Sequence, residues 1–165
     1  MSWRGEKIGG MTREEMNEFL KGPWTARLAT LKPDGWPYVV PCWYHWDGVA
    51  FWVVPRERSV WAHNMALDPR VCLVVDEPDP PIRKVICEGI AVVVEAAVGP
   101  YLENGEKYTG PRYLGERAAE YRGGVNVEPC WTFKIVPRRL TTWQGYDWHP
   151  RYKHPELYPK AERED

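Results

Sequence analysis

Three residues between positions 54 and 60 have side chains suited to binding an anion. Arg56 and Arg58 carry fixed positive charge and forked donors, and Ser59 adds a hydroxyl. Ser59 precedes the segment "VWAHNMAL", which we expect to be a short helix that ends before Pro69. The first N–H groups of a helix point toward an anion bound at its amino end. The spacing therefore predicts either a phosphate site or, as the simpler interpretation, a helix cap beside two solvated arginines.

Other site chemistries have little support in the sequence. There is no G-x-S-x-G motif for a serine nucleophile, and none of the cysteines forms a C-x-x-C pair. The histidines lack the spacing of metal ligands; they are His45, His63, His149 and His154. We therefore assign no catalytic acid, base or nucleophile and no metal site.

Composition limits the class of protein. A chain of 165 residues is expected to form one domain, and a net charge of −1 offers no electrostatic basis for binding nucleic acid or an anionic membrane. We see no signal peptide and no apolar run of about 20 residues that would span a membrane. Three of the four cysteines lie in apolar, strand-like runs, which suits a reducing cytoplasm. The ten Trp and nine Tyr are suited to cores, interfaces and ligand walls.

The elements that would position the anion site are mostly strands. A helix is expected over residues 12–21, because Thr12 and Glu15 have capping-box spacing. Gly89 is expected to mark a bulge or bend in one of the longer strands. Expected strands cover residues 25–31, 36–46, 49–54, 70–76 and 83–95, with one or two closing strands over 130–137 and 139–143.

This order predicts a mainly β fold with a few helices. The antiparallel strands would close into a small barrel of six to seven strands with helical caps. We expect a single domain over residues 1–145, with a further helix around 112–122, followed by a polar tail over 146–165.

Several short patterns, in this order, resemble the pyridoxamine 5′-phosphate oxidase-like family. They are "A-T-x-x-x-D-G-x-P" from Ala29, "S-x-x-x-x-N-x-x-x-D-P-R-V" from Ser59, and "G-x-A" from Gly89. The similarity covers about residues 25–95. Members of this family are flavin or deazaflavin oxidoreductases with a split β-barrel. The resemblance therefore implies a homodimer that binds FMN, or alternatively F420, at the subunit interface and acts on a small-molecule substrate.

The resemblance also implies which residues would form the site. The second strand would run along the isoalloxazine ring, Ser59 would bind the phosphate, and Lys84 would be offered from a partner strand. The implied cofactor-binding residues are Val40, Pro41, Cys42, Trp43, Val54, Pro55, Arg56, Arg58, Ser59, Trp61, Asn64 and Lys84. An aromatic wall against the substrate would come from Tyr44, Trp143 and Trp148.

One departure from the family pattern concerns the phosphate. Flavin-binding members usually carry Arg-Lys after the serine, whereas this chain has Val60 and Trp61. Arg56 and Arg58 are then expected to supply the positive charge. Two alternatives stay open: a non-catalytic carrier of flavin, F420 or haem on the same fold, and a purely structural dimer whose tryptophans fill the interface. The ending "RLTTWQG" does not reproduce the terminal pattern of true pyridoxamine-phosphate oxidases.

Overall fold

Two α-helices and a set of mostly antiparallel strands make up the part of the chain that the structure describes. The structure, a computed structural model, describes residues 2–3, 10–79, 82–96, 113, 115–117 and 129–145. In chain order the elements are β1 (Ser2–Trp3), α1 (Arg13–Leu20), β2 (Ala26–Leu31), β3 (Pro37–Cys42), β4 (His45–Trp46), β5 (Phe51–Val53), α2 (Val60–Leu67), β6 (Arg70–Asp76), β7 (Lys84–Ala96), η2 (Gly115–Arg117) and β8 (Trp131–Trp143).

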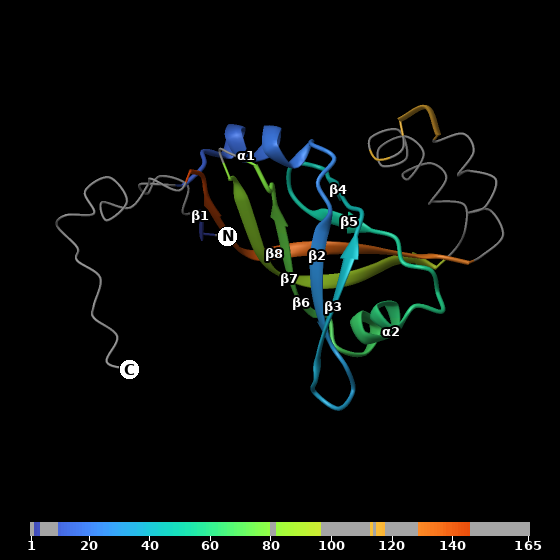
Figure 1. Cartoon of the computed structure of the whole chain (residues 1–165). Helices are drawn as coiled ribbons and strands as arrows, with labels where there is room; N and C mark the ends of the chain where they lie inside the picture. Colours follow the sequence, from blue (N-terminus) through green and yellow to red (C-terminus); the bar gives the residue numbers. More distant parts are fainter. Residues whose placement is uncertain are drawn as a thin grey trace, which may run out of the picture.

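Within these residues the strands form one eight-stranded sheet. Its order is β3-β2-β6-β7-β8-β5-β4, and β1 pairs with β8 in parallel while the other pairs are antiparallel. Figure 1 shows the sheet curling into a half-barrel, with α1 at one end and α2 beside the β2–β3 hairpin. The mainly β, antiparallel barrel expected from the sequence is confirmed, and the short parallel β1 is an addition to it.

The core lies on the concave side of the sheet because inward residues of neighbouring strands stand in register. Leu28, Leu73, Cys87 and Leu140 are paired across β2, β6, β7 and β8, and all four are buried. Burying such apolar side chains contributes roughly 1.5–3 kcal/mol each. Residues of α1 and α2 close the two ends of this core.

The predicted N-terminal helix corresponds to α1. The Thr12 hydroxyl accepts a hydrogen bond from the Glu15 N–H at 3.2 Å, and the Glu15 carboxylate accepts one from the Thr12 N–H at 2.8 Å. This reciprocal capping box is the arrangement that the spacing predicted.

The long return strand expected over residues 36–46 is wrong, because it is broken into β3 and β4. The break falls at Trp43 and Tyr44, where long-range hydrogen bonds to α1 redirect the chain. The Tyr44 hydroxyl donates to the Leu20 carbonyl at 3.0 Å, and the Trp46 indole N–H donates to Asn17 Oδ1 at 2.8 Å. The next strand is also shorter than predicted, because β5 covers three residues.

The two longest strands, β7 and β8, pair along almost their whole length. Their register shifts at Glu88/Gly89, so the predicted irregularity at Gly89 is confirmed as a β-bulge. The closing region is one strand, β8, rather than two. Of the helix predicted around 112–122, Gly115–Arg117 form a 3-10 turn and most other positions lie outside the described residues, as do residues 146–165. No helix in the described part of the chain is long and apolar enough to cross a membrane.

Candidate functional site

The junction between β5 and α2 is held in place by the start of β8. The Trp131 N–H donates to the Pro55 carbonyl at 3.0 Å, and the Glu57 N–H donates to the Pro129 carbonyl at 2.9 Å. Arg56 forms an isolated β-bridge in the same region. Pro55 is buried, so the junction is anchored on its inner side. These two hydrogen bonds form the bridge between Arg56 and Cys130, and they hold the turn in a defined position.

Ser59 is the N-cap residue of α2, but its hydroxyl does not cap the helix. Its φ of −75° and ψ of 134° are ordinary for an N-cap, yet there is no side-chain cap hydrogen bond. The first N–H groups of a helix have no acceptor inside the helix. In α2 the Ala62 and His63 N–H groups donate to the Ser59 carbonyl, so the Ser59 hydroxyl lies beside the N–H groups of Val60 and Trp61, the kind of helix terminus that favours an anion. The simple capping role considered for Ser59 is not what the structure shows.

Arg56 and Arg58 flank this helix terminus in the turn. Both side chains are exposed, and the Ser59 N–H donates to the Arg56 carbonyl at 2.9 Å, which closes the turn between them. Val54, the last residue before the anchored Pro55, is half-buried. The residue types predicted for an anion site are thus brought into one turn.

The position of α2 depends on a buried polar contact. The Asn64 amide donates to the Thr30 hydroxyl at 3.0 Å, and that hydroxyl donates to the Tyr38 carbonyl at 3.4 Å. Asn64 and Thr30 are both almost fully buried. The Asn64–Thr30 hydrogen bond connects α2 to the β2–β3 hairpin. It therefore helps to fix the position of the helix and of its amino end. Trp61, on the same helix, is half-buried and packs against the core.

Strand β3 forms one edge of the described sheet. It pairs with β2 alone, so its second row of backbone groups points away from the sheet, and Pro41 contributes no N–H to that row. Val40 is half-buried, Pro41 is exposed and Cys42 is buried. Burial raises the pKa of the Cys42 thiol to about 12, so this side chain is a neutral thiol at neutral pH.

The two aromatic residues after β3 have different surroundings. The Trp43 ring stacks on Tyr113, with centroids 4.8 Å apart and planes 3° apart. The Tyr113 hydroxyl donates to the Trp24 carbonyl at 2.7 Å. Tyr44 is fully buried, so its ring is part of the core. Sequence reasoning missed Tyr113, because a single tyrosine in a polar segment has no pattern that would select it.

Lys84 and Trp143 lie next to each other on β7 and β8, in a part of the sheet that is separated from β3 by two strands. They are register partners on β7 and β8, and the Lys84 ammonium lies 5.3 Å from the Trp143 ring centroid. Strands β2 and β6 separate β7 from β3, which is roughly 14 Å along the sheet. Within one chain Lys84 therefore lies away from β3. Trp148 lies outside the described residues.

Metal-binding groups do not gather in this region. Among the described residues, no three His, Cys, Asp or Glu side chains are placed to hold a metal ion together. The β5–α2 junction carries the two arginines and the Ser59 hydroxyl, together with the exposed Glu57 carboxylate between the arginines.

A half-barrel of antiparallel strands with two short helices is the architecture of split-barrel proteins. The sequence pattern of the pyridoxamine 5′-phosphate oxidase family matches residues 12–129, and the chain belongs to this family. A search among curated proteins gave no match.

Solved structures with the same fold include proteins of several kinds. A conserved hypothetical protein from Mycobacterium tuberculosis, Rv2991, is similar at 26% identity with a TM-score of 0.71, and the match covers 96% of each chain. A structure described as an F420 reductase matches at 23% identity with a TM-score of 0.57, over 75% of this chain and 94% of its own. HutZ, a haem storage protein from Vibrio cholerae, matches at 20% identity with a TM-score of 0.62, over 80% of this chain and 95% of its own.

Proposed function

We propose that the protein is an FMN- or F420-dependent oxidoreductase that transfers a hydride to or from a small, planar substrate. The observation that carries this proposal is the β5–α2 junction. There a serine hydroxyl that does not cap its helix, the first N–H groups of that helix and two arginines are placed together. A phosphate that leaves water needs such charge-assisted hydrogen bonds.

The residues present fit a phosphate-bearing cofactor despite the departure from the family pattern. Val60 is exposed and Trp61 packs against the core, so neither replaces the usual Arg-Lys pair. Arg56 and Arg58 stand in the preceding turn, and they would neutralise the phosphate from there. Guanidinium groups are well suited to this role because they bind oxyanions through paired donors.

The flat part of the cofactor would lie along β3. The edge backbone groups around Val40 and Cys42 would form hydrogen bonds with the polar atoms of its ring. Trp43 would exclude water from one side of the ring. When bound, such a cofactor supplies the hydride chemistry itself, so the chain needs no nucleophile of its own.

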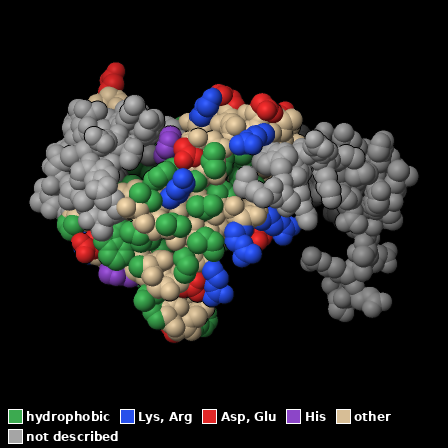
Figure 2. Space-filling model, turned by 180° about the vertical axis from the view of Figure 1, so that it is seen from behind, with side chains coloured by type: hydrophobic (Ala, Val, Ile, Leu, Met, Phe, Trp, Pro, Cys, Tyr) green, Lys and Arg blue, Asp and Glu red, His purple; other side chains and the backbone are tan. Residues whose placement is uncertain are grey.

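A second copy of the chain would complete the site. On the outward face of the sheet, Val39 and Ala29 share a row with Cys72, and Val74 pairs with Ile86 in the next row. Val39 is 62% exposed, although it is apolar. Figure 2 shows a molecular face with hydrophobic side chains across its middle and Lys and Arg side chains near them. Apolar faces of this kind mark interaction surfaces.

Docking of two copies through the outward sheet face would also explain the place of Lys84. This side chain belongs to the same outward set as Ile86, and it is far from β3 of its own chain. In a dimer the partner's Lys84 and Trp143 would approach the cofactor and the substrate.

The proposal is tested by an absorption spectrum of the purified protein and by titration with FMN and with F420. We expect a bound flavin spectrum, or quenching of F420 fluorescence, followed by turnover with a reductant. A colourless protein with no affinity for either cofactor would contradict it.

A second candidate is a non-catalytic carrier of flavin, F420 or haem. It is favoured by the missing Arg-Lys pair and by the fold shared with a haem storage protein. A Soret band in the purified protein would support haem binding, and bound flavin without turnover would support a flavin carrier.

A further inference from the structure

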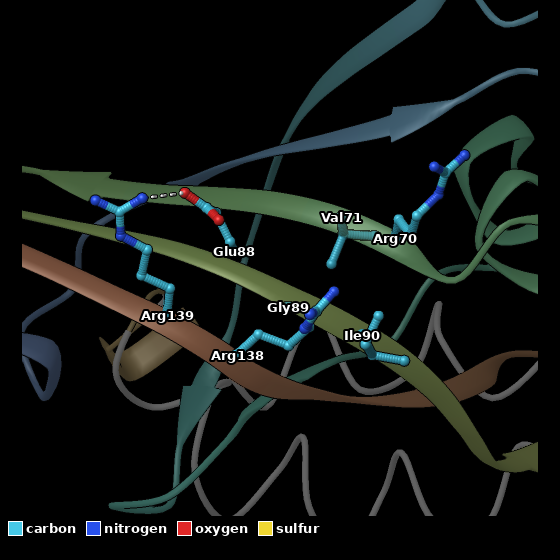
Figure 3. Close-up of a pocket in the computed structure, with 7 residues that line it drawn as sticks. All are labelled: Arg70, Val71, Glu88, Gly89, Ile90, Arg138 and Arg139. Carbon is cyan, nitrogen blue, oxygen red and sulfur yellow. Dashed lines mark ion pairs between the residues drawn. The ribbon is translucent and has the colours of Figure 1, made fainter. Parts of the chain in front are cut away.

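A second cluster of cationic side chains lies on the outward face where β6, β7 and β8 meet. Its Glu88–Arg139 pair continues the row of Ala29 and Cys72, so the cluster borders the surface through which two copies are proposed to dock. A pocket of about 470 Å³ opens there, and Figure 3 shows the side chains around it. Arg138 and Arg139 come from β8, Glu88 from β7 and Arg70 from β6. The pocket lies near the carboxyl end of α2, whereas Ser59 lies at its amino end.

A β-bulge creates this cluster. Glu88 is the register partner of Arg139, and Gly89 is the partner of Pro137, so Arg138 is an extra residue in β8. Consecutive side chains of a regular strand point to opposite faces. Here Arg138 and Arg139 are both exposed, while Pro137 before them is buried. The bulge therefore places both arginines on the same outward face, where the Arg139 guanidinium turns toward Glu88 and the Arg138 side chain extends toward Gly89 and Ile90 (Figure 3).

The three arginines are not equally available to a ligand. Arg70 is held by Asp68, with an N–O distance of 2.5 Å, and this pair lowers the pKa of Asp68 to about 2. In Figure 3 the Arg70 guanidinium points away from the other cationic side chains. Arg139 is 3.5 Å from the Glu88 carboxylate, which is longer than a charge-assisted hydrogen bond.

Arg138 differs from the other two arginines. Among the residues that the structure describes, no carboxylate lies within ion-pair distance of it, and its side chain extends over β7 near Gly89 and Ile90 (Figure 3). The pocket lining thus carries three guanidinium groups against one carboxylate, with Val71 and Ile90 as apolar walls.

We infer that this pocket binds a small oxyanion, the phosphate or carboxylate group of a small molecule, with Arg138 as its main contact. A guanidinium group offers paired donors that match either group. The apolar walls would contact the part of the ligand next to its charge.

The test separates this pocket from the proposed cofactor site. In full-length protein carrying Arg56→Gln and Arg58→Gln, binding of inorganic phosphate and of acetate is measured by calorimetry at constant ionic strength. We expect one remaining anion site. In the same background, Arg138→Gln should lower the anion affinity of this site about tenfold or more, as expected for the loss of a charge-assisted hydrogen bond. Arg13→Gln, an exposed arginine on α1, is the matched control and should change nothing.

A site-specific readout accompanies the titration. In ¹⁵N-labelled protein the amide signal of Gly89 should shift on addition of the tighter of the two anions, and this shift should disappear in Arg138→Gln. The phosphate and acetate arms show which oxyanion is preferred. Absence of binding in the Arg56→Gln/Arg58→Gln background would overturn the inference. Equal anion affinity with and without the Arg138 side chain would also overturn it. The same holds if Arg138→Gln changes the association of two copies but leaves anion affinity unchanged.

Discussion

Ser59 and Thr12 occupy the same position in two helices of equal length, and they use their hydroxyls differently. The Thr12 hydroxyl accepts a hydrogen bond from the Glu15 N–H, whereas the Ser59 hydroxyl makes no cap hydrogen bond. A cap contributes to stability, while an uncommitted hydroxyl next to helix N–H groups is suited to a ligand. The two residues therefore form a natural pair for separating stability from binding.

We predict opposite effects of alanine at these two positions. Ser59→Ala should change the free energy of unfolding by less than about 0.5 kcal/mol and weaken FMN binding about tenfold. Thr12→Ala should cost about 1 kcal/mol and leave FMN binding unchanged. Chemical denaturation and fluorescence titration measure both quantities. A large loss of stability in Ser59→Ala would mean that its hydroxyl has a structural role.

The Glu77–Arg83 pair closes the β6–β7 connection and is largely buried. Arg83 Nε and Nη2 donate to the two Glu77 carboxylate oxygens at 2.7 and 2.8 Å, and Glu77 is 5% exposed. The Arg83 guanidinium also lies 5.0 Å from the Phe19 ring centroid, which connects this pair to α1. Hydrogen bonds from Arg83 lower the pKa of the Glu77 carboxyl.

This lowered pKa gives a pH dependence of stability with a defined sign. Because the folded pKa of Glu77 is below its unfolded value, its contribution is fully present above the unfolded pKa and is lost as pH falls through the folded pKa. We expect Glu77→Gln to cost about 2–3 kcal/mol at pH 7, less than for a fully buried pair because Arg83 is partly exposed. The deficit relative to wild type should shrink on acidification in urea titrations. Glu18→Gln, which breaks an exposed pair with Lys21, is the control and should change stability by less than about 0.5 kcal/mol at pH 7.

At the scale of elements, the alternation of apolar residues was enough to predict most strands. Strands β2, β6 and β7 match their predicted ranges closely, because their inward residues repeat every second position. The break between β3 and β4 was not predictable in the same way. It depends on hydrogen bonds from Tyr44 and Trp46 to α1, which join residues far apart in sequence.

The β-bulge at Gly89 leaves little room for a side chain, so replacing this glycine with alanine should disturb it. A Cβ at this position would lie 2.8 Å from the Ile135 Cγ2 atom and 3.0 Å from the Val136 carbonyl oxygen. We predict that Gly89→Ala costs about 1–3 kcal/mol, because the backbone oxygen cannot move aside cheaply. Thermal unfolding measures this loss. Unchanged stability would mean that β7 and β8 adjust their register at the bulge without cost.

At the scale of the whole molecule, the proposed site combines residues from several elements and, in the proposed dimer, from a second copy of the chain. Sequence patterns selected Ser59, Arg56 and Arg58. Because these residues are close together in the chain, their place in one turn could be predicted from their spacing. The buried contacts of Asn64 with Thr30 and of Tyr44 with Leu20 could not be read in this way, because each partner comes from a different element. The bulge that places Arg138 beside Arg139 likewise appears only once β7 and β8 are paired.

Pairing of two chains through the outward sheet face is itself testable. We predict that Val39→Glu or Ile86→Glu gives a monomer that loses FMN affinity, because a buried unpaired carboxylate opposes docking. Val49→Glu should leave association unchanged, because Val49 is equally apolar and 57% exposed but lies in the β4–β5 turn. Sedimentation equilibrium distinguishes the states. A monomeric wild-type protein that still binds cofactor would contradict the shared site.

The proposed function depends on a phosphate that binds at the start of α2 with Arg56 and Arg58 as its cationic partners. It is tested most directly by titrating FMN and riboflavin, which lacks the phosphate, into wild type and into the Arg56→Gln/Arg58→Gln protein. We predict that the double substitution weakens FMN affinity about 30-fold or more and leaves riboflavin affinity within about twofold of wild type. Equal weakening of both ligands, or no weakening of FMN, would contradict it.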